Sequence, residues 1–371
     1  MDKKIKVLLV SPYSEKRVGG IGTWTKSVLD FCIFDKETDI KFQNTAFKLK
    51  RLIKDSIVKR IIIGGLDSLI ILVKLFFNML LYCPDVVHYT SSAGFGLLKD
   101  RIAVFIVKKI FKKKFVIHWH FGRIPDMYSR YNREYQRLRI VHKKSDASIV
   151  LDIRSKDAMV ADNLTNVYVV PNAATETVLS FAKSINIEKI QEQRRDREVL
   201  FVGHILPTKG IFELVKACSQ INDLHLTVVG PDMNGIIPKL KEIAKVRDNG
   251  NWITFTGELN REKVLAYYQI CSIFCLPSYS EGFPYVILES MSCGCPIIAT
   301  KVGAIPEMLS GGCGLVINPK EINELKSGII KLINDRTLSI DMGNRAYYKV
   351  LQDYSINTVY NAYKSIWRQV L

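Results

Sequence analysis

The sequence predicts an α/β protein of two domains, each with a parallel sheet covered by helices. Three observations lead to this fold class. The chain has 371 residues, which suggests about two domains at roughly 100–200 residues each. Short runs rich in Val and Ile alternate with longer, more polar stretches, as in sheets with helical crossovers. The short runs are mostly continuous in hydrophobicity, which is typical of parallel strands buried on both faces.

The first half contains five predicted strands. Its first apolar run, Lys6–Val10, is short and has no small-residue cleavage site after it. We therefore interpret this run as a strand and not as a signal peptide. The later strands are expected at Asp85–His88, Phe115–His118, Ala147–Leu151 and Val167–Val170.

The strand series starts again after a polar, charged stretch from Asn186 to Glu198. Phe212–Gln220 and Arg261–Ile270 have the length and polarity of helices. We place the domain boundary near Pro171–Thr177, which gives domains at 1–173 and 174–355 and a C-terminal helix at 356–371 that packs back on the first domain. Strands of the second domain are expected at Val199–Val202, Leu224–Val229, Ile253–Phe255, Ile273–Leu276, Pro296–Ala299 and Gly314–Ile317.

The stretch Arg60–Tyr82 is apolar enough to require a membrane test. A membrane-spanning helix needs about 20 residues, and this stretch is long enough. Asp67 and Lys74 interrupt it, and a charge at the centre of such a helix costs roughly 2.5–3.5 kcal/mol on insertion scales. We therefore expect a pair of buried or interfacial helices, with a membrane span as the alternative.

The formal net charge of +17 comes almost entirely from the first half of the chain. Residues 1–171 hold 31 Lys and Arg against 16 Asp and Glu, whereas residues 172–371 hold 22 against 20. Such asymmetry suggests that the first half meets a polyanion, such as a membrane surface, a phosphorylated lipid or nucleic acid.

The densest basic stretch is Lys108–Lys114, with Phe111 among its lysines. A basic residue near anionic lipid contributes about 1 kcal/mol, so the stretch predicts peripheral docking on a membrane. An ordinary solvated face is the alternative. No nucleic-acid motif accompanies the charge, so we expect no nucleic-acid partner. Other basic residues that follow are Arg123, Arg130, Arg133, Arg137, Arg139, Lys143 and Lys144.

The eight cysteines are expected to be reduced and buried. No histidine or second Cys-x-x-Cys pair flanks them at zinc spacing, so we expect no metal site. Without a signal peptide the protein is expected in the cytoplasm, where thiols stay reduced and pack as small apolar groups. They are Cys32, Cys83, Cys218, Cys271, Cys275, Cys293, Cys295 and Cys313.

Two segments of the first half are candidates for a ligand site. Ser11–Gly22 joins the first strand to a helix, and its Gly19 and Gly20 allow a phosphate to approach the backbone and the helix N-terminus. The dinucleotide and P-loop patterns are absent, so a plain connection is an equal alternative. His118 and His120 end a predicted strand, where side chains of parallel sheets face ligands. A structural histidine is the alternative for each, more so for His118.

The second half carries a candidate phosphate site in Leu200–Gly210, sequence LFVGHILPTKG. Gly203 ends a predicted strand, and Lys209 precedes a helix. An ammonium group beside a helix N-terminus suits a diphosphate. A solvated surface lysine is the alternative.

The strongest motif is Ser280–Cys295, sequence SEGFPYVILESMSCGC. Glu281 follows a predicted strand, and Glu289 lies eight positions later on a helix that begins near Pro284. Carboxylates accept paired hydrogen bonds from vicinal hydroxyls, so the two side chains suit a sugar and a ribose. The amides at the start of this helix suit phosphate.

These segments resemble the family 4 retaining glycosyltransferases, which have the GT-B fold of two Rossmann-like domains facing each other across a cleft. The resemblance covers about residues 199–319 through LFVGHILPTKG, FTGEL, IFCLPS, EGFPYVILE, GCPIIATKVGAIPE and GLVINP. The first half matches less densely, through the glycine loop, DVVHYTS, HWHFG and PNA.

The resemblance implies a role for each matching residue. Glu281 corresponds to the acid that contacts the donor sugar, Glu289 to the acid that binds the nucleotide ribose, and Lys209 to the lysine that binds the donor diphosphate. In the first domain, Gly20 corresponds to the glycine near the phosphates, and His120 to the histidine near the reacting sugar, with His118 as the competing candidate.

Two positions depart from the family pattern. His204, next to Gly203, stands where the family usually has Arg, which removes a bidentate phosphate donor. Pro284 stands where many members have Gly and deletes one amide donor, so that phosphate binding passes to the amides of Tyr285 and Val286. Phe283, just before this proline, completes the expected donor-binding set.

The resemblance implies a metal-independent enzyme without a cofactor, which moves a hexose from a nucleotide diphosphate sugar to an acceptor with retention of configuration. The donor is expected on the second domain and the acceptor on the basic first domain. That acceptor is expected to be a lipid-linked or surface-polysaccharide glycan, and the enzyme to be peripheral at the inner face of the cell membrane. A GT-B nucleotide-sugar epimerase and a catalytically degenerate membrane scaffold are the alternatives.

Overall fold

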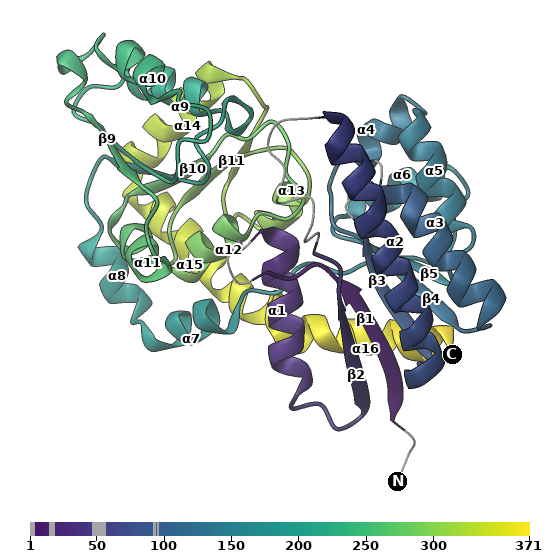
Figure 1. Ribbon diagram of the computed structural model, residues 1–371. Coiled ribbons are helices and arrows are strands. Elements are labelled where there is room, and N and C mark those ends of the chain that lie inside the picture. The colour runs from purple at the N-terminus through teal and green to yellow at the C-terminus, as the bar shows by residue number, and fades with distance from the viewer. Residues whose placement is uncertain (1–3, 15–18, 47–56, 92–93, 95) are drawn as a thin grey trace. The chain divides into compact units, whose positions relative to one another are not determined.

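The structure is a computed structural model that describes residues 4–14, 19–46, 57–91, 94 and 96–371, without the side chains of 57–61. The chain divides into two compact units (Figure 1). Unit 1 is Met1–Ala173 together with Ile356–Leu371, and unit 2 is Ala174–Ser355.

Unit 1 is built on a six-stranded parallel sheet in the order β2-β1-β3-β4-β5-β6. Val7 and Leu9 of β1 pack on one face of this sheet, and Leu8 and Val10 pack on the other, because successive side chains of a strand point to opposite sides. Both faces are therefore buried, as the continuous apolar runs predict. The strands are β1 (Ile5–Ser11), β2 (Thr38–Asn44), β3 (Val86–Ser91), β4 (Lys114–Trp119), β5 (Ala147–Val150) and β6 (Val167–Val169).

The two faces of the unit 1 sheet are covered by different helices. One face packs against α1 (Gly20–Cys32) and the C-terminal helix α16 (Ile356–Val370). The helices on the other face are α2 (Ile57–Tyr82), α3 (Gly96–Phe105), the π-helix η2 (Ile106–Ile110), α4 (Ile124–Ser129), α5 (Arg133–His142) and α6 (Ile153–Ala161). Helix α16, at the end of the chain, is thus part of the same unit as the N-terminal residues.

Strand β2 is missing from the sequence prediction. It lies at the edge of the sheet and pairs with β1 alone. Only Thr38 and Gln43 are buried among its seven residues, and the others are exposed or half-buried. An exposed edge strand does not need a continuous run of apolar residues, so a search for such runs does not detect β2.

The expected helix pair at Arg60–Tyr82 is wrong, because a single 26-residue helix, α2, runs through the stretch. Gly64 and Gly65 lie inside it; each glycine weakens a helix by about 1 kcal/mol but leaves its hydrogen bonds intact. Within the described residues, Ile62–Tyr82 is long and apolar enough to cross a membrane, yet only 28% of it is buried in the protein.

Unit 2 has a second six-stranded parallel sheet, in the order β12-β11-β10-β7-β8-β9. The sequence predicts all six strands to within two residues at each end. The strands are β7 (Glu198–Val202), β8 (His225–Val229), β9 (Ile253–Gly257), β10 (Ile273–Leu276), β11 (Ile297–Thr300) and β12 (Leu315–Ile317).

Helices cover the unit 2 sheet as well. The larger apolar core includes residues of α9 (Ile211–Cys218), α10 (Ile237–Ala244), α14 (Ile322–Asn334) and α15 (Arg336–Asp353). Helix α12 (Tyr285–Ser292) packs against α7 (Glu176–Ser184), α11 (Arg261–Ile270) and α15. The short elements are α8 (Ile187–Gln193), α13 (Ile305–Met308) and the 3-10 turns η3 (Pro207–Lys209) and η4 (Asp248–Gly250).

All eight cysteines are free thiols, but the expectation that all are buried is only partly right. Cys83 is exposed and Cys32 is half-buried. Cys83 follows α2 directly, in a left-handed conformation that ends the helix at the surface. The other six are buried in unit 2, where Cys271 and Cys295 lie with their Sγ atoms 3.2 Å apart.

Candidate functional site

The strand order of unit 2 reverses between β7 and β10. From β7 the chain continues outward to β8 and β9, whereas β10 begins the opposite half with β11 and β12. In an open parallel sheet, ligands bind outside the carboxyl ends of the strands at such a reversal. The loops that follow β7 and β10 carry Lys209 and Glu281, respectively. Topology therefore places these two predicted residues at the expected ligand position.

The loop after β7 leads through η3 to α9. Gly210 joins η3 to α9 in the left-handed conformation, with φ +68°. A Cβ atom at this position would lie 2.0 Å from the carbonyl oxygen of Pro277. Only glycine lets the β7 loop approach the β10 loop this closely, and the approach brings Lys209, one residue earlier, toward the β10 loop.

The loop after β10 is held by hydrogen bonds to two other loops. The amide of Tyr279 donates to the carbonyl of Thr208 at 2.9 Å, and the amide of Ala304 donates to the carbonyl of Gly282 at 2.9 Å. Thr300, at the end of β11, also donates through Oγ1 to a carbonyl of this loop, that of Ser278. Glu281 therefore sits on backbone that is fixed on both sides.

Lys209 and Glu281 form an ion pair, with Nζ 2.5 Å from Oε1. Their side chains keep 26% and 12% of their surface exposed, so a ligand can reach both. An ammonium is a donor for phosphate oxygens, and a carboxylate is an acceptor for hydroxyls. A ligand that offers both groups can exchange this ion pair for two new interactions.

Glu289 lies in the second turn of α12 and is almost buried, with 12% of its side chain exposed. Burial raises the pKa of its carboxyl group to about 7, and Arg261 offsets this in part. The guanidinium Nε of Arg261 is 3.7 Å from Oε1 of Glu289, and its NH1 donates to Oγ1 of Thr175. Sequence reasoning missed Arg261, because 28 positions separate it from Glu289 and no motif links them.

The remaining predicted residues of unit 2 occupy different positions. His204 is exposed in the loop after β7, and Phe283 is buried against the ring of Tyr354, 5.6 Å between centroids. The packing of Phe283 on Tyr354 thus helps to fix the β10 loop. Tyr285 and Val286 open α12, and its N-cap residue, Pro284, makes no side-chain hydrogen bond to the helix. Gly203 ends β7 and its amide bonds to Val229.

In unit 1, Gly20 is the first residue of α1, and a Cβ atom on it would meet nothing within 4 Å. Part of the predicted glycine loop, residues 15–18, lies outside the described residues. His118 is fully buried in β4, and His120 follows the last residue of that strand half-buried, with the two rings 3.9 Å apart. Burial lowers the pKa of His120 to about 3 and that of His118 well below its usual value, so both rings are neutral at pH 7.

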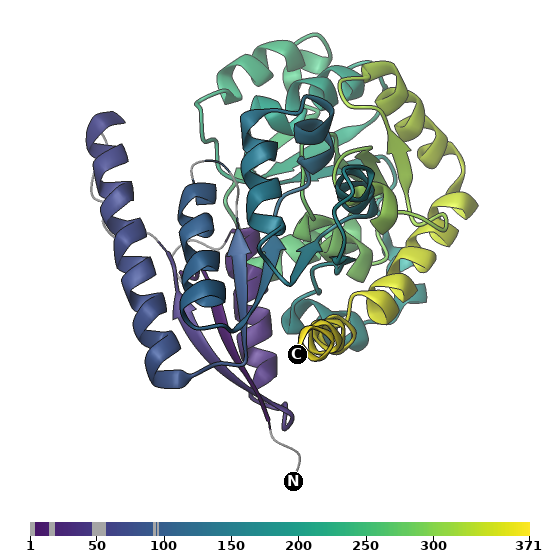
Figure 2. The same ribbon diagram turned by 90° about the vertical axis from the view of Figure 1, so that its right-hand side faces the viewer.

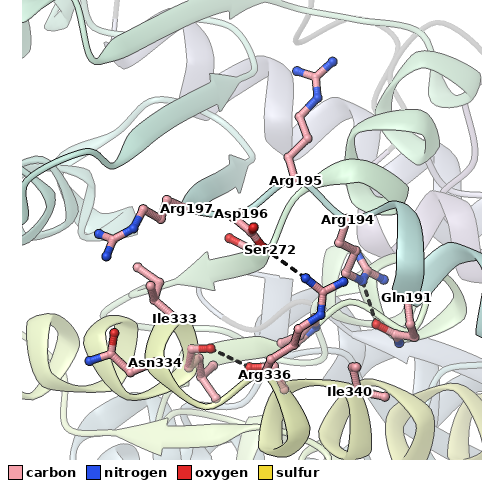
Figure 3. A pocket seen from close by; sticks show the side chains of 13 residues that line it. Gln191, Arg194, Arg195, Asp196, Arg197, Ser272, Ile333, Asn334, Arg336 and Ile340 are labelled. Atoms are coloured by element: carbon pink, nitrogen blue, oxygen red, sulfur yellow. Dashed lines mark hydrogen bonds and ion pairs between the residues drawn. The ribbon is translucent and has the colours of Figure 1, made fainter.

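A cavity of about 320 Å³ in unit 2 is lined by several arginines (Figure 3). Arg194 donates to the carbonyls of Tyr268, Cys271 and Cys293, and Arg336 pairs with Asp196. Figure 3 shows Arg195 directed away from both. The lining of the cavity includes Arg197 and Ser272, which directly precede β7 and β10, so the cavity lies at the amino ends of these strands, opposite the site described above. Its guanidinium groups are therefore mostly engaged, and we do not assign a ligand to it.

Within the described parts of the chain, no group of three or more His, Cys, Asp or Glu side chains is arranged to hold a metal ion.

Comparisons with known proteins indicate which family the second half of the chain resembles. A family model described as Glycosyl transferases group 1 matches residues 182–349, all within unit 2. An uncharacterized glycosyltransferase of Methanocaldococcus jannaschii is 35% identical over 145 residues, which are 39% of this chain and 40% of that relative. A second uncharacterized glycosyltransferase of the same organism is 26% identical over 401 residues, which cover 100% of both chains.

Solved structures show a similar architecture. HepE from Anabaena, solved in complex with UDP, aligns with a TM-score of 0.71 and 17% identity over 98% of this chain and 100% of that chain. The same protein has been solved with UDP-glucose, and that structure aligns with a TM-score of 0.69. At this identity the likeness establishes the fold, and the two parallel sheets are those of a GT-B protein.

A substitution at Gly303 tests whether the backbone at Glu281 is as tightly packed as the structure shows. A Cβ atom at Gly303 would lie 2.2 Å from the carbonyl oxygen of Glu281. Gly303→Ala should lower the melting temperature and weaken ligand binding at Lys209 and Glu281. Gly311→Ala is the matched control, because Gly311 also has positive φ, at +73°, but has nothing within 4 Å. Equal melting temperatures for the two variants would contradict the packing described here.

Glu289 should make the protein less stable as the pH rises. Its carboxyl pKa of about 7 in the folded state exceeds the value of 4.5 for a free group. The folded state therefore holds the proton more tightly, and stability falls between about pH 4.5 and pH 7 by on the order of 3 kcal/mol. Glu289→Gln removes this loss, so its melting temperature should exceed that of the wild type at pH 8 but not at pH 5.

The exposed Glu262 of α11 provides the control for this measurement, as Glu262→Gln. Thermal denaturation of the three proteins at several pH values decides the outcome. A constant difference between wild type and Glu289→Gln across this range would mean that the carboxylate is not penalised by burial.

Proposed function

We propose that the chain, which resembles the group 1 glycosyltransferases over residues 182–349 and has the GT-B fold, transfers a hexose from a nucleotide diphosphate sugar to an acceptor, with retention of the anomeric configuration. The observation that carries the proposal is the Lys209–Glu281 ion pair at the strand-order reversal. A nucleotide diphosphate sugar offers phosphate oxygens and vicinal hydroxyls, which are the two groups that this pair binds. The complex of HepE with UDP-glucose shows such a donor on the same fold.

Each donor-site residue acts on a different part of the donor. Lys209 meets the charge that develops on the leaving diphosphate, together with the N–H groups at the start of α12. Glu281 accepts hydrogen bonds from the sugar hydroxyls, and Glu289 accepts them from the ribose. In this proposal the leaving phosphate itself takes the proton of the acceptor hydroxyl, and no metal ion or cofactor is needed.

Preorganisation supports this assignment. Lys209 and Glu281 are held by backbone contacts between the β7 and β10 loops, so their charges do not need to be repositioned when the donor binds. Fixed charges aimed at a developing oxyanion are usually the largest contribution to catalysis. His204 is exposed on the same loop and replaces the arginine of related enzymes. The diphosphate therefore depends more heavily on Lys209 here.

Glu281→Ala should lower kcat/KM for sugar transfer by on the order of 10²-fold, because hydrogen bonds that strengthen in the transition state are lost. The rate is measured with a nucleotide sugar identified by a thermal-shift screen, since a ligand that binds only the folded state raises the melting temperature. Glu192→Ala, an exposed glutamate on α8, is the control. A folded Glu281→Ala protein with full activity would reject the assigned role.

Product analysis separates the proposal from its two alternatives. Retention requires that an α-linked donor yields an α-linked product, which NMR spectroscopy of the product reads directly. A GT-B epimerase would convert the nucleotide sugar without any acceptor. A degenerate scaffold would bind no nucleotide sugar in calorimetry, although the intact Lys209–Glu281 pair argues against it.

We further propose that unit 1 binds a membrane surface through α2, where a lipid-linked or surface-polysaccharide acceptor is made. One side of α2 is a stripe of exposed apolar side chains, spaced three or four positions apart as on one face of a helix. Together with a shorter stripe on the neighbouring α3, it forms the apolar face of unit 1. Its residues are Ile62, Leu66, Leu69, Ile70, Val73, Phe76, Phe77, Leu80 and Leu81 on α2, and Leu98, Ile102 and Phe105 on α3.

Figure 2 shows α2 as the long blue helix at the left edge, with one side turned away from the rest of unit 1. An exposed apolar area of this length exceeds the scattered apolar residues of ordinary surfaces. Only Asp67 and Lys74 are charged within Ile62–Tyr82, so the helix offers little to a polar partner. The hydrocarbon boundary of a bilayer is the partner that this chemistry fits.

The basic stretch Lys108–Lys114 contributes less charge than the sequence suggests. Lys108 and Lys114 both pair with Asp146, at 2.7 and 3.9 Å, and Lys113 lies 3.8 Å from Asp85. Lys109 and Lys112 are exposed. The proposed membrane contact is therefore carried mainly by apolar burial, with these lysines adding a preference for anionic lipid.

Vesicle flotation tests this contact. The double variant Phe77→Asp with Leu81→Asp should lower binding to anionic phospholipid vesicles more than tenfold, because burying one large apolar side chain contributes about 1.5–3 kcal/mol. High salt should weaken wild-type binding only in part. Val246→Asp is the control, since Val246 is 82% exposed in unit 2.

Unchanged flotation of the double variant would reject the membrane contact. Light scattering without vesicles provides the second measurement. If the wild type is an oligomer and the double variant a monomer, then the apolar face of unit 1 binds a second copy of the chain instead.

A further inference from the structure

Three neutral histidines and three large aromatic residues form a buried cluster on one face of the unit 1 sheet. His88 of β3 and His118 of β4 are fully buried, and the ring of His120 lies 3.9 Å from that of His118, tilted by 35°. The aromatic residues come from α1 and α16, and they are Trp24, Tyr363 and Trp367.

Hydrogen bonds in this cluster run in one direction. The indole Nε1–H of Trp367 can only donate, and it lies 3.1 Å from Nδ1 of His88. Nδ1 of His88 must therefore be the acceptor, which leaves the proton of this ring on Nε2. Nε2 of His88 lies 3.2 Å from Nδ1 of His118. Since His88 now donates, the proton of His118 must also be on Nε2.

The donor order of these hydrogen bonds requires that the histidine rings are uncharged. Burial lowers the pKa of His88 to about 3, and it lowers the pKa of His118 well below its usual value, with the two neighbouring histidines adding to the effect. A charged ring would carry protons on both nitrogens and could not accept from the previous member of the chain. The donor order from Trp367 through His88 to His118 is thus the one that satisfies every nitrogen between them.

We propose that Trp367 and His88 are positioning residues, which fix the proton of His118 on Nε2 and so keep a hydrogen-bond donor beside His120 at the carboxyl end of β4. Nε2 of His118 is buried and has no protein partner. The chain of hydrogen bonds makes the C-terminal helix α16 a support for the strand that carries His120. This inference rests on the proposed function only where it concerns catalysis.

The other tautomer of His118, with its proton on Nδ1, would push its ring away from that of His88. With its proton on Nδ1, His118 would present N–H to the N–H of His88 across 3.2 Å, and two donors repel at that distance. The ring of His118 would then turn, and His120, whose ring lies 3.9 Å from it, would lose this packing contact. The histidine that related enzymes place near the reacting sugar would be misplaced.

Nitrogen-15 NMR spectroscopy of the full-length protein, labelled at its histidine rings, reads each tautomer, because protonated and bare ring nitrogens resonate far apart. In the wild type, His88 and His118 should both carry their proton on Nε2. Trp367→Phe keeps the ring but removes the donor, and it should give His118 a mixture of tautomers. His142, whose Nδ1 bonds to Ser148 elsewhere in unit 1, serves as the internal reference.

Two further variants separate positioning from packing. His88→Gln should preserve the donor order of the hydrogen bonds, because an amide can accept from Trp367 at one end and donate to His118 at the other. Tyr363→Phe removes a hydroxyl of the same cluster that accepts from Nε1 of Trp24 and takes no part in the chain. It should lower the melting temperature and leave the tautomer of His118 unchanged.

Activity provides the second measurement. Trp367→Phe should lower kcat by about tenfold with little change in the donor KM, because a misplaced group weakens the transition state more than ground-state binding. His88→Gln should keep wild-type kcat. A single Nε2–H tautomer of His118 in folded Trp367→Phe, or equal loss of kcat in Trp367→Phe and Tyr363→Phe, would overturn the proposal. If the wild type itself transfers no sugar, the proposed function fails, and the tautomers still test the hydrogen-bond chain.

Discussion

The position of the candidate site depends on one constraint, the hydrogen-bonded pairing of β7 with β10 at the reversal of strand order. Both strands run in the same direction, so their following loops leave the sheet at the same edge. Residues 72 positions apart are brought to 2.5 Å in this way. Glycine at Gly210 lets the two loops touch, and without that contact the ion pair would have no fixed geometry.

At the candidate site, unit 2 contains a residue that lowers its stability at neutral pH, Glu289. Glu289 is a carboxyl group held in apolar surroundings with a guanidinium at 3.7 Å as its nearest compensation. Such a group disfavours its own charged form, and a protein selected for stability alone would replace it. The raised pKa of Glu289 and the partly exposed Lys209–Glu281 ion pair are both typical of functional sites.

Unit 1 uses the two faces of its sheet differently. On one face, α1 and α16 enclose a cluster in which the polar nitrogens mostly satisfy each other, so that histidines remain neutral deep in the protein. On the other face, α2 buries one side and leaves the opposite side apolar and exposed. The first arrangement favours a defined geometry, and the second favours a partner that is itself apolar.

The sequence alone determined the fold class and most strands, because strands buried on both faces must be continuously apolar whatever their neighbours are. It also singled out Lys209, Glu281 and Glu289, since a glycine or proline beside a helix start marks a local turn that can be recognised without coordinates. Edge strand β2 and the unbroken helix α2 were not recognised, because exposure removes the pattern in one case and glycine only weakens the helix in the other.

Tertiary structure alone decided which distant residues meet: Lys209 with Glu281, Arg261 with Glu289, and Trp367 with His88. These contacts depend on strand order and loop packing, which arise from the whole sheet and leave no local trace in the chain.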